Sequence, residues 1–395
     1  MISIEEIKKE VINNHDYVVS LRRYFHMHPE LSKKEYNTAL KIEEELDKLN
    51  IYHKRVDETG VYAVIKGKNS GKTVLLRADI DALPILEKSD VSYKSLNDGV
   101  MHACGHDGHI ATLLGAAKIL SNHLDDIYGT IILNFQQAEE IGYGARQFID
   151  RGLVNNVDRC FGIHVASNLE SGKIAIVKGP NNASVDWFKM NVYGKSTHVS
   201  QPEKGIDALY IASLIVVSLQ SIASRLNSPM DNVLVGIGKM TSGTSYNIVA
   251  SEAELEGTVR CLTKEIRKNT KESIERIANN IAAMYNASVK FEWKDFTSPL
   301  INDNEACDEC ITIANEIFGA NNVVKDRKPS LTGDDMAEYI NVCKGAYLYL
   351  GTRNPKKPNT LSAQHNEYFD IDEDALINSV SMYSLYALEY LYNNK

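Results

Sequence analysis

The sequence predicts an α/β protein with a mixed sheet, into which a smaller α+β domain is inserted. Helical and strand-like patterns alternate from the start of the chain to about residue 180, and they resume after Pro299. Between these parts the order changes to strand, helix, strand, strand, helix, strand, which is typical of a ferredoxin-like domain. We therefore expect a main domain formed by residues 1–183 and 297–395, and an inserted domain at residues 184–296.

The elements of the main domain follow from the spacing of its apolar residues. Helical periodicity covers residues 4–27 and 35–50. Two strand-like runs at 61–65 and 73–77, joined by a turn-rich segment, predict a hairpin. The elements expected after them are a helix beginning after Gly108, a strand at 129–135 that is buried on both faces, a helix at 144–150 and a strand at 159–165.

The inserted domain is expected to begin with a half-exposed strand at 187–193. The elements after it are a long apolar helix at about 205–226, strands at 232–240 and 252–261, a charged helix at about 264–285 and a strand at 288–295. Because the main domain continues after this insertion, its last part must return to the same sheet as its first part.

Composition and charge argue against nucleic acid and membrane partners. The 395 residues have a net charge of −9 and no long basic run. No stretch approaches the roughly 20 apolar residues needed to span a bilayer, and the charged N-terminal segment does not resemble a signal peptide. Six unevenly spaced cysteines fit a reducing compartment. We therefore expect a cytoplasmic protein.

Five potential metal ligands and one additional carboxylate lie in turns or at the ends of strand-like runs. They are Cys104, His106, the adjacent pair Glu139 and Glu140, His164 and His365. Loops at the carboxyl ends of strands are where open α/β sheets place their sites, so we expect these segments to meet. Thiolate, imidazole and carboxylate together suit zinc, manganese or cobalt better than magnesium or calcium.

The two adjacent carboxylates predict hydrolysis. A bound metal lowers the pKa of its water to about 7, and a carboxylate within reach can take that proton and pass it to a leaving amine. Neighbouring side chains point in different directions, so one of Glu139 and Glu140 can bind metal while the other acts as the base. The residues alone do not decide which has which role.

Several segments together resemble the M20 metallopeptidase family, and more narrowly its aminoacylase-like amidohydrolase branch. That branch includes hippurate hydrolases, indole-acetyl-amino-acid hydrolases and N-acetyl-diaminopimelate deacetylases. The resemblance covers essentially the whole chain, and its most specific segments are Cys-Gly-His-Asp at 104–107 and Ala-Glu-Glu at 138–140. The other matching segments are 22–32, 76–84, 161–165, 257–260, 332–335 and 364–366.

The resemblance implies a site with two divalent metal ions in the main domain. In this site Cys104 bridges the metals, and His106, Glu140, His164 and His365 complete the ligand set. The same pattern assigns Glu139 as the general base and then the general acid. It also implies that Asp79 and Asp81 orient the ligands from behind. The metals are manganese, zinc, cobalt or nickel, and the sequence does not choose among them.

The resemblance also implies that the inserted domain closes over the substrate as a lid and forms a homodimer. His198 matches the histidine that polarises the scissile carbonyl, an oxyanion-stabilising role. Asn247 and Arg260 are expected to hold the substrate carboxylate, which a guanidinium can bind bidentately. The segments around His198 and Gln364 depart from the usual pattern, so no substrate is transferred from a named relative.

We therefore expect a metal-dependent amidohydrolase that cleaves small N-acyl amino acids to a carboxylic acid and a free amino acid. Two alternatives stay open. One is a dipeptidase or aminopeptidase of the same fold. Comparing the hydrolysis of acetyl- or benzoyl-amino acids with the hydrolysis of dipeptides distinguishes this peptidase from the amidohydrolase. The other is a non-catalytic metal-containing binding protein, against which the additional carboxylate Glu139 argues, because a structural metal site needs no base.

Overall fold

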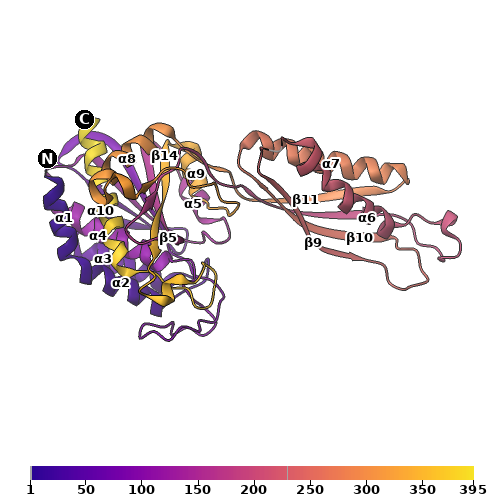
Figure 1. Ribbon diagram of the computed structural model, residues 1–395, viewed down its shortest axis with the longest axis horizontal. Coiled ribbons are helices and arrows are strands. Elements are labelled where there is room, and N and C mark those ends of the chain that lie inside the picture. Colours follow the sequence, from indigo (N-terminus) through magenta and orange to yellow (C-terminus); the bar gives the residue numbers. More distant parts are fainter. Residues whose placement is uncertain (1, 229) are drawn as a thin grey trace. The chain divides into compact units, whose positions relative to one another are not determined.

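The computed structural model describes residues 2–228 and 230–395, and the chain divides into two compact units (Figure 1). The main unit comprises Met1–Gly179, Asn302–Lys328 and Asp335–Lys395. The inserted unit comprises Pro180–Ile301 together with the short segment Pro329–Asp334. A two-stranded sheet of β7 (Gly179–Asn182) and β12 (Leu300–Asn302) lies where the chain passes from one unit to the other and back.

The main unit is built on an eight-stranded mixed sheet with the order β1-β2-β4-β3-β5-β14-β6-β13. Neighbours β4, β3, β5 and β14 run parallel, while β1 and β2 are antiparallel. A mixed α/β sheet is therefore present as predicted. Its strands are β1 (Tyr52–Val56), β2 (Gly60–Lys66), β3 (Asn69–Asp79), β4 (Tyr128–Gln136), β5 (Arg159–Glu170), β6 (Ile174–Ala175), β13 (Val323–Val324) and β14 (Gly345–Arg353).

The predicted hairpin is wrong, because β4 lies between β2 and β3. β2 pairs antiparallel with β4, and β3 pairs parallel with the other edge of β4. The connecting segment crosses the start of β4, where Gly67 N donates to Gly129 O at 3.0 Å. β4 is apolar and buried on both faces over most of its length, as expected of a central strand. A turn-rich segment thus predicts a chain reversal, but it does not determine which strands pair.

Helices cover both faces of the main sheet. The helix predicted at 4–27 is two helices that meet at Asn14, which ends α1 and precedes α2. α4 and α10 lie across one face, while α5 and α9 pack together on the other. The helices of this unit are α1 (Ile4–Asn13), α2 (His15–Met27), α3 (Tyr36–Lys48), α4 (His106–Asn122), α5 (Gly144–Asp150), α8 (Asn304–Phe318), α9 (Met336–Val342) and α10 (Leu376–Asn393).

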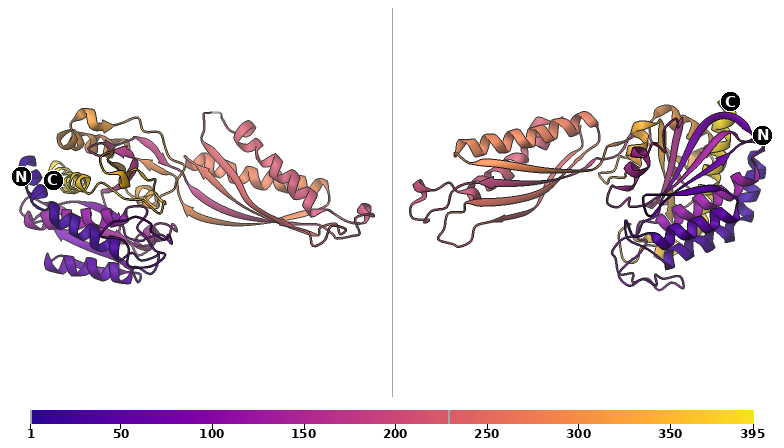
Figure 2. Two further views of the ribbon diagram at one scale, coloured as in Figure 1. Left: turned by 60° about the horizontal axis from the view of Figure 1, so that its bottom comes forward. Right: turned by 180° about the vertical axis from the view of Figure 1, so that it is seen from behind.

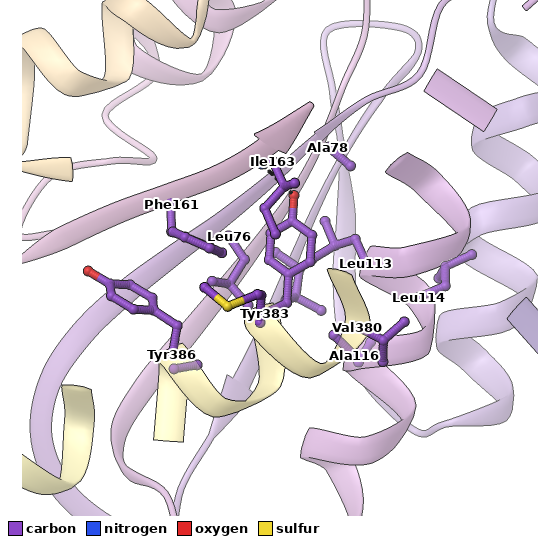
Figure 3. Close-up of a cluster of buried hydrophobic side chains, with 14 of the residues drawn as sticks. Leu76, Ala78, Leu113, Leu114, Ala116, Phe161, Ile163, Val380, Tyr383 and Tyr386 are labelled. Carbon is purple, nitrogen blue, oxygen red and sulfur yellow. Dashed lines mark hydrogen bonds between the residues drawn. The ribbon is translucent and has the colours of Figure 1, made fainter. Parts of the chain in front are cut away.

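Figure 3 shows the core between α4, α10 and the sheet, where aliphatic side chains surround the rings of α10. Phe161 of β5 stacks on Tyr386 with 4.5 Å between ring centroids. The Tyr383 hydroxyl donates to Arg77 O at 2.8 Å and accepts from Ile163 N at 3.1 Å. One buried phenol therefore ties α10 to both β3 and β5, directly behind the strand ends where the candidate ligands lie.

The inserted unit is a four-stranded antiparallel sheet with two long helices, seen in both views of Figure 2. Its strand order β11-β8-β10-β9 is the ferredoxin-like arrangement that the order of elements predicts. Its elements are β8 (Val185–Tyr193), α6 (Ala208–Leu219), β9 (Val233–Ser242), β10 (Glu252–Cys261), α7 (Lys264–Met284) and β11 (Ser288–Thr297).

One expectation about apolar stretches is wrong, because Ala208–Leu226 is long and apolar enough to cross a membrane by length and composition. This stretch is α6 with a following π-helical turn. Ile211, Ile215 and Leu219 on one side are buried against the four-stranded sheet, as in the core helix of a folded domain. Its opposite side is also apolar, and Val217 is 72% exposed there.

Candidate metal and catalytic site

Neighbouring parallel strands bring polar residues to one edge of the main sheet. β4, β3 and β5 lie side by side and run in the same direction. The segment after β3 leads to Asp81, the segment after β4 leads to Glu139 and Glu140, and His164 lies within β5. The site therefore lies at the carboxyl ends of adjacent parallel strands, the usual place in an open α/β sheet.

The five residues predicted as ligands lie together in the main unit. Cys104 Sγ is 3.5 Å from His164 Nε2. Glu140 Oε1 is 4.0 Å from His106 Nε2 and 3.6 Å from His365 Nε2. The ligand atoms of Cys104, His106 and Glu140 all lie within 4.8 Å of one another. Four separate segments of the chain thus present thiol, imidazole and carboxylate groups to one small volume.

A glycine makes the turn between Cys104 and His106 possible. Gly105 has a φ of +94°, in the left-handed region that side-chain-bearing residues rarely adopt, and α4 begins at the next residue. A Cβ at this position would meet Val165 Cγ2 at 2.3 Å. Both the backbone conformation and the space therefore require glycine where the two ligand-bearing side chains diverge.

Hydrogen bonds determine which ring nitrogen each histidine presents to the site. His106 Nδ1 lies 2.9 Å from Asp81 O, and His164 Nδ1 lies 2.7 Å from Val165 O. A carbonyl oxygen can only accept, so Nδ1 carries the proton in both rings. Nε2 is therefore the ring atom that each histidine presents toward Cys104 or Glu140.

These residues fit divalent metal ions on the evidence of their own buried atoms. His106 Nε2 and Glu140 Oε1 are buried and make no hydrogen bond with any residue in the described part of the chain. Leaving a buried polar atom without a partner costs about 1–3 kcal/mol. A cation bound by both atoms accounts for the pair, and thiolate, imidazole and carboxylate are a suitable donor set for zinc, manganese or cobalt.

His109 and His102 are buried beside the cluster, and His109 is not arranged as a ligand. Val165 N donates to His109 Nε2 at 3.0 Å, and His109 Nδ1 contacts Asp79. Both nitrogens of His109 are therefore occupied, and the ring holds Asp79 in place. For His102, burial lowers the pKa to about 3, so this side chain stays neutral.

The turn that presents Glu139 and Glu140 is held by carboxylates behind it. Ala138 has a φ of +53°, which is uncommon for a residue with a side chain. Its N–H donates to Glu35 Oε1 at 2.8 Å. The next two amides, of Glu139 and Glu140, donate to the two carboxylate oxygens of Asp81, each at 3.1 Å. Three consecutive N–H groups therefore fix the directions in which the two glutamates point.

Burial and mutual repulsion dominate the electrostatics of the cluster. Burial raises the pKa of Glu140 to about 7, and the nearby carboxylates of Asp81 and Asp79 act in the same direction. Burial also raises the pKa of the Cys104 thiol well above its usual range, with a further contribution from Glu140. Burial opposes a charge on His106, yet Asp79 and Cys104 raise its pKa well above the usual value. The cluster therefore favours positive charge at its centre.

A buried arginine links the start of α4, where His106 lies, to the loop that holds His365. Arg22 of α2 is fully buried and contacts Asp107 at 2.9 Å and Asp370 at 2.7 Å. Asp107 follows His106, and Asp370 belongs to the loop that begins at His365. The segment around Arg22 is part of the family resemblance. Nothing in the sequence indicated that this side chain joins the start of α4 to the loop of His365. Glu35 was not identified either, because a lone glutamate before a helix gives no signal.

The remaining predicted residues lie in the inserted unit. His198 is exposed, and its Nδ1 accepts from Ser200 N at 3.2 Å, which leaves Nε2 to carry the proton. Val199 N donates to Asn247 O at 3.0 Å, so His198 and Asn247 lie on adjacent segments. Arg260 lies on β10, on the face of the sheet opposite α6 and α7, as the alternating burial shows.

Comparison with known proteins identifies the family. Residues 75–389 match the family described as Peptidase family M20/M25/M40. The chain belongs to this family. It is 39% identical to thermostable carboxypeptidase 2 of Saccharolobus solfataricus over 98% of both chains. It is 37% identical to N-acetylcysteine deacetylase of Bacillus subtilis, with 92% of this chain and 93% of the relative covered.

Solved structures give the same result. A Bacillus subtilis protein described as a dinuclear metal binding peptidase from the M20 family is 34% identical, with a TM-score of 0.84 over 96% of this chain and 98% of that chain. The predicted family is therefore confirmed, and with it a metal-dependent enzyme that hydrolyses amide bonds. The roles of the individual residues stay predictions.

Proposed function

We propose that this M20 enzyme hydrolyses N-acyl amino acids to a carboxylic acid and a free amino acid. The observation that supports this most is the buried pair of His106 Nε2 and Glu140 Oε1, without hydrogen-bond partners, next to a second glutamate. A structural metal site has no need of that additional carboxylate. The similarity to N-acetylcysteine deacetylase supports an acylated amino acid as substrate.

In this proposal two divalent metal ions are held by the five clustered ligands. The residues that would hold them are Cys104, His106, Glu140, His164 and His365. Bound metals supply a water whose pKa is lowered to about 7 and polarise the amide carbonyl. The donor set is compatible with manganese, zinc, cobalt or nickel, and metal content after purification identifies which one is bound.

Glu139 is assigned as the base that takes the proton of the attacking water and returns it to the leaving nitrogen. Its backbone N–H is held by Asp81, so the side chain starts from a fixed position. Its neighbour Glu140 approaches both His106 and His365, which suits a ligand. The two roles that the residues alone left open are thereby divided between adjacent positions.

Residues 184–296 act in this proposal as the lid, with residues 1–183 and 297–395 as the catalytic domain. His198 donates its Nε2 proton to the developing oxyanion, because Ser200 N occupies Nδ1. Arg260 and Asn247 bind the carboxylate of the substrate. The Arg260 guanidinium makes no hydrogen bond to any of the residues that the structure describes, so it is available for such a ligand.

A homodimer in the cytoplasm completes the proposal. The outer side of α6 exposes Leu209, Tyr210 and Val217, an apolar face that a second copy of this chain can cover. All six cysteines are free, which fits a reducing compartment. Size-exclusion chromatography with light scattering tests the dimer, and a Val217→Lys variant is expected to be monomeric.

A peptide substrate is the second candidate, because the chain is also similar to a thermostable carboxypeptidase. Both reactions break an amide whose leaving group is an amino acid with a free carboxylate, so both use the same carboxylate contact. They differ only on the acyl side of the bond. The relatives therefore leave the acyl group as the feature to be measured.

The test is turnover of a panel after loading the protein with manganese or zinc. The panel contains N-acetyl-, N-benzoyl- and indole-acetyl-amino acids, acetyl-diaminopimelate, dipeptides and longer peptides. We expect metal-dependent release of free amino acid from one acyl class. Cleavage of peptides alone would identify the protein as a peptidase. No turnover across the panel would favour a non-catalytic binding protein.

A further inference from the structure

The side chain of Gln364 lies among three of the predicted ligands. It precedes His365, whose N–H donates to Ala103 O at 2.8 Å and so holds this loop against the segment of Cys104. Gln364 Nε2 lies 3.4 Å from Cys104 O, 3.7 Å from Cys104 Sγ and 3.3 Å from Val165 O. The last of these oxygens also accepts from His164 Nδ1 at 2.7 Å.

The surroundings determine which end of the Gln364 amide faces the cluster. Two carbonyl oxygens and a sulfur are acceptors, and the fourth neighbour, His164 Nδ1 at 3.3 Å, directs its proton to Val165 O, so the amide nitrogen faces the three acceptors. The amide then has two N–H groups to share among Cys104 and Val165. Removing this side chain therefore takes an N–H donor away from both the Cys104 segment and Val165 O.

We propose that Gln364 is a positioning residue that holds the Cys104 sulfur and His164 at the separation required for metal binding. This inference rests on the proposed metal-dependent hydrolase. The amide donates to Cys104 Sγ and also to the carbonyl that orients His164, so one side chain contacts both the segment before α4 and β5. Donation to the sulfur lowers its electron density, and groups that orient ligands in this way typically change metal affinity by about 10–100-fold.

Cobalt binding provides a readout that does not depend on turnover. Apo-protein is titrated with Co²⁺, and the thiolate-to-cobalt charge-transfer absorption reports the Cys104–metal bond. We expect Gln364→Leu to raise the dissociation constant for Co²⁺ about 10–100-fold and to shift this absorption band to longer wavelength, because the sulfur loses a hydrogen-bond donor. Gln364→Met, which keeps the unbranched shape, is measured beside it in case the branched side chain prevents folding.

Ser362→Ala is the matched control, because Ser362 lies in the same loop and makes no side-chain hydrogen bond within the described ranges 2–228 and 230–395. Its cobalt affinity and band are expected to equal those of the wild type. Wild-type affinity and band position in both Gln364 variants would overturn the inference. A wild type that binds cobalt through a thiolate but hydrolyses nothing in the panel would instead overturn the proposed function alone.

Discussion

The main unit and the inserted unit hold their predicted functional residues in opposite ways. In the main unit His106 and His164 are buried, and each is oriented by a backbone carbonyl behind it. In the inserted unit His198 is exposed, and the hydrogen bonds of its ring go to Ser200, two residues away. The cluster of candidate ligands is thus fixed by contacts within the main unit, whereas His198 is held only by a neighbour two residues away.

The largest expected effect comes from substituting the two adjacent glutamates one at a time and comparing the variants. Glu139→Gln is expected to lower kcat about 10²–10⁴-fold with metal content unchanged, because it removes a proton acceptor and no ligand. Glu140→Gln is the matched comparison, and it is expected to lose bound metal. Steady-state kinetics and metal analysis of both variants check this, and an exchange of the two phenotypes would reverse the assignment.

The role proposed for His198 in the inserted unit, stabilising the oxyanion, is tested by His198→Ala. Loss of one donor to an oxyanion typically lowers kcat about 10²–10³-fold, and we expect that loss with a much smaller change in KM. Ser200→Ala serves as the control, because the backbone N–H of residue 200 still occupies His198 Nδ1, so an effect below about tenfold is expected. If both variants keep wild-type kcat, the inserted unit takes no part in the chemistry.

The rigidity of the main site is tested at Gly105. Gly105→Ala is expected to destabilise the fold by about 1–3 kcal/mol through its backbone alone, and to weaken metal binding further through contact with Val165. Gly99→Ala is the matched control, because Gly99 also has a positive φ of 75° but nothing within 4 Å of its missing Cβ. Urea unfolding and metal titration measure both effects. Equal metal affinity in the two variants would show that the turn at Gly105 does not control the ligands.

A smaller effect is expected at Glu35, which supports the turn before Glu139. Burial raises the pKa of Glu35 to about 7, with a contribution from Asp81. The folded state therefore binds a proton more tightly than the unfolded chain, and this group lowers stability as pH rises from about 4.5 to 7. Glu35→Gln removes this dependence, so the stability of the variant relative to the wild type is expected to be up to about 3 kcal/mol more favourable at pH 8 than at pH 4.5.

Chemical denaturation at several pH values measures the difference between Glu35→Gln and the wild type. An exposed carboxylate variant, Glu44→Gln, is the control and is expected to give a curve parallel to the wild type. A Glu35→Gln curve that is also parallel would mean that this buried carboxylate titrates as in the unfolded chain.

Much of the fold follows from local pattern, and the errors have physical causes. The ferredoxin-like order and the alternation of helices and strands were predicted because each depends on periodicity within one segment. The predicted hairpin failed because β4 pairs with both β2 and β3, a choice that depends on packing among distant segments. The break at Asn14 was missed because apolar spacing continues across it.

The same division applies to the site. The sequence by itself determined the family and the candidate residues, because ligands of these chemical types follow strand ends in a recognisable order. Only the tertiary structure decided how they are supported. Asp81 and Glu35 bind three consecutive amides, Arg22 joins the start of α4 to the loop of His365, and Gln364 donates toward Cys104. Such contacts join residues far apart in the chain, and they exist only once the segments have packed together.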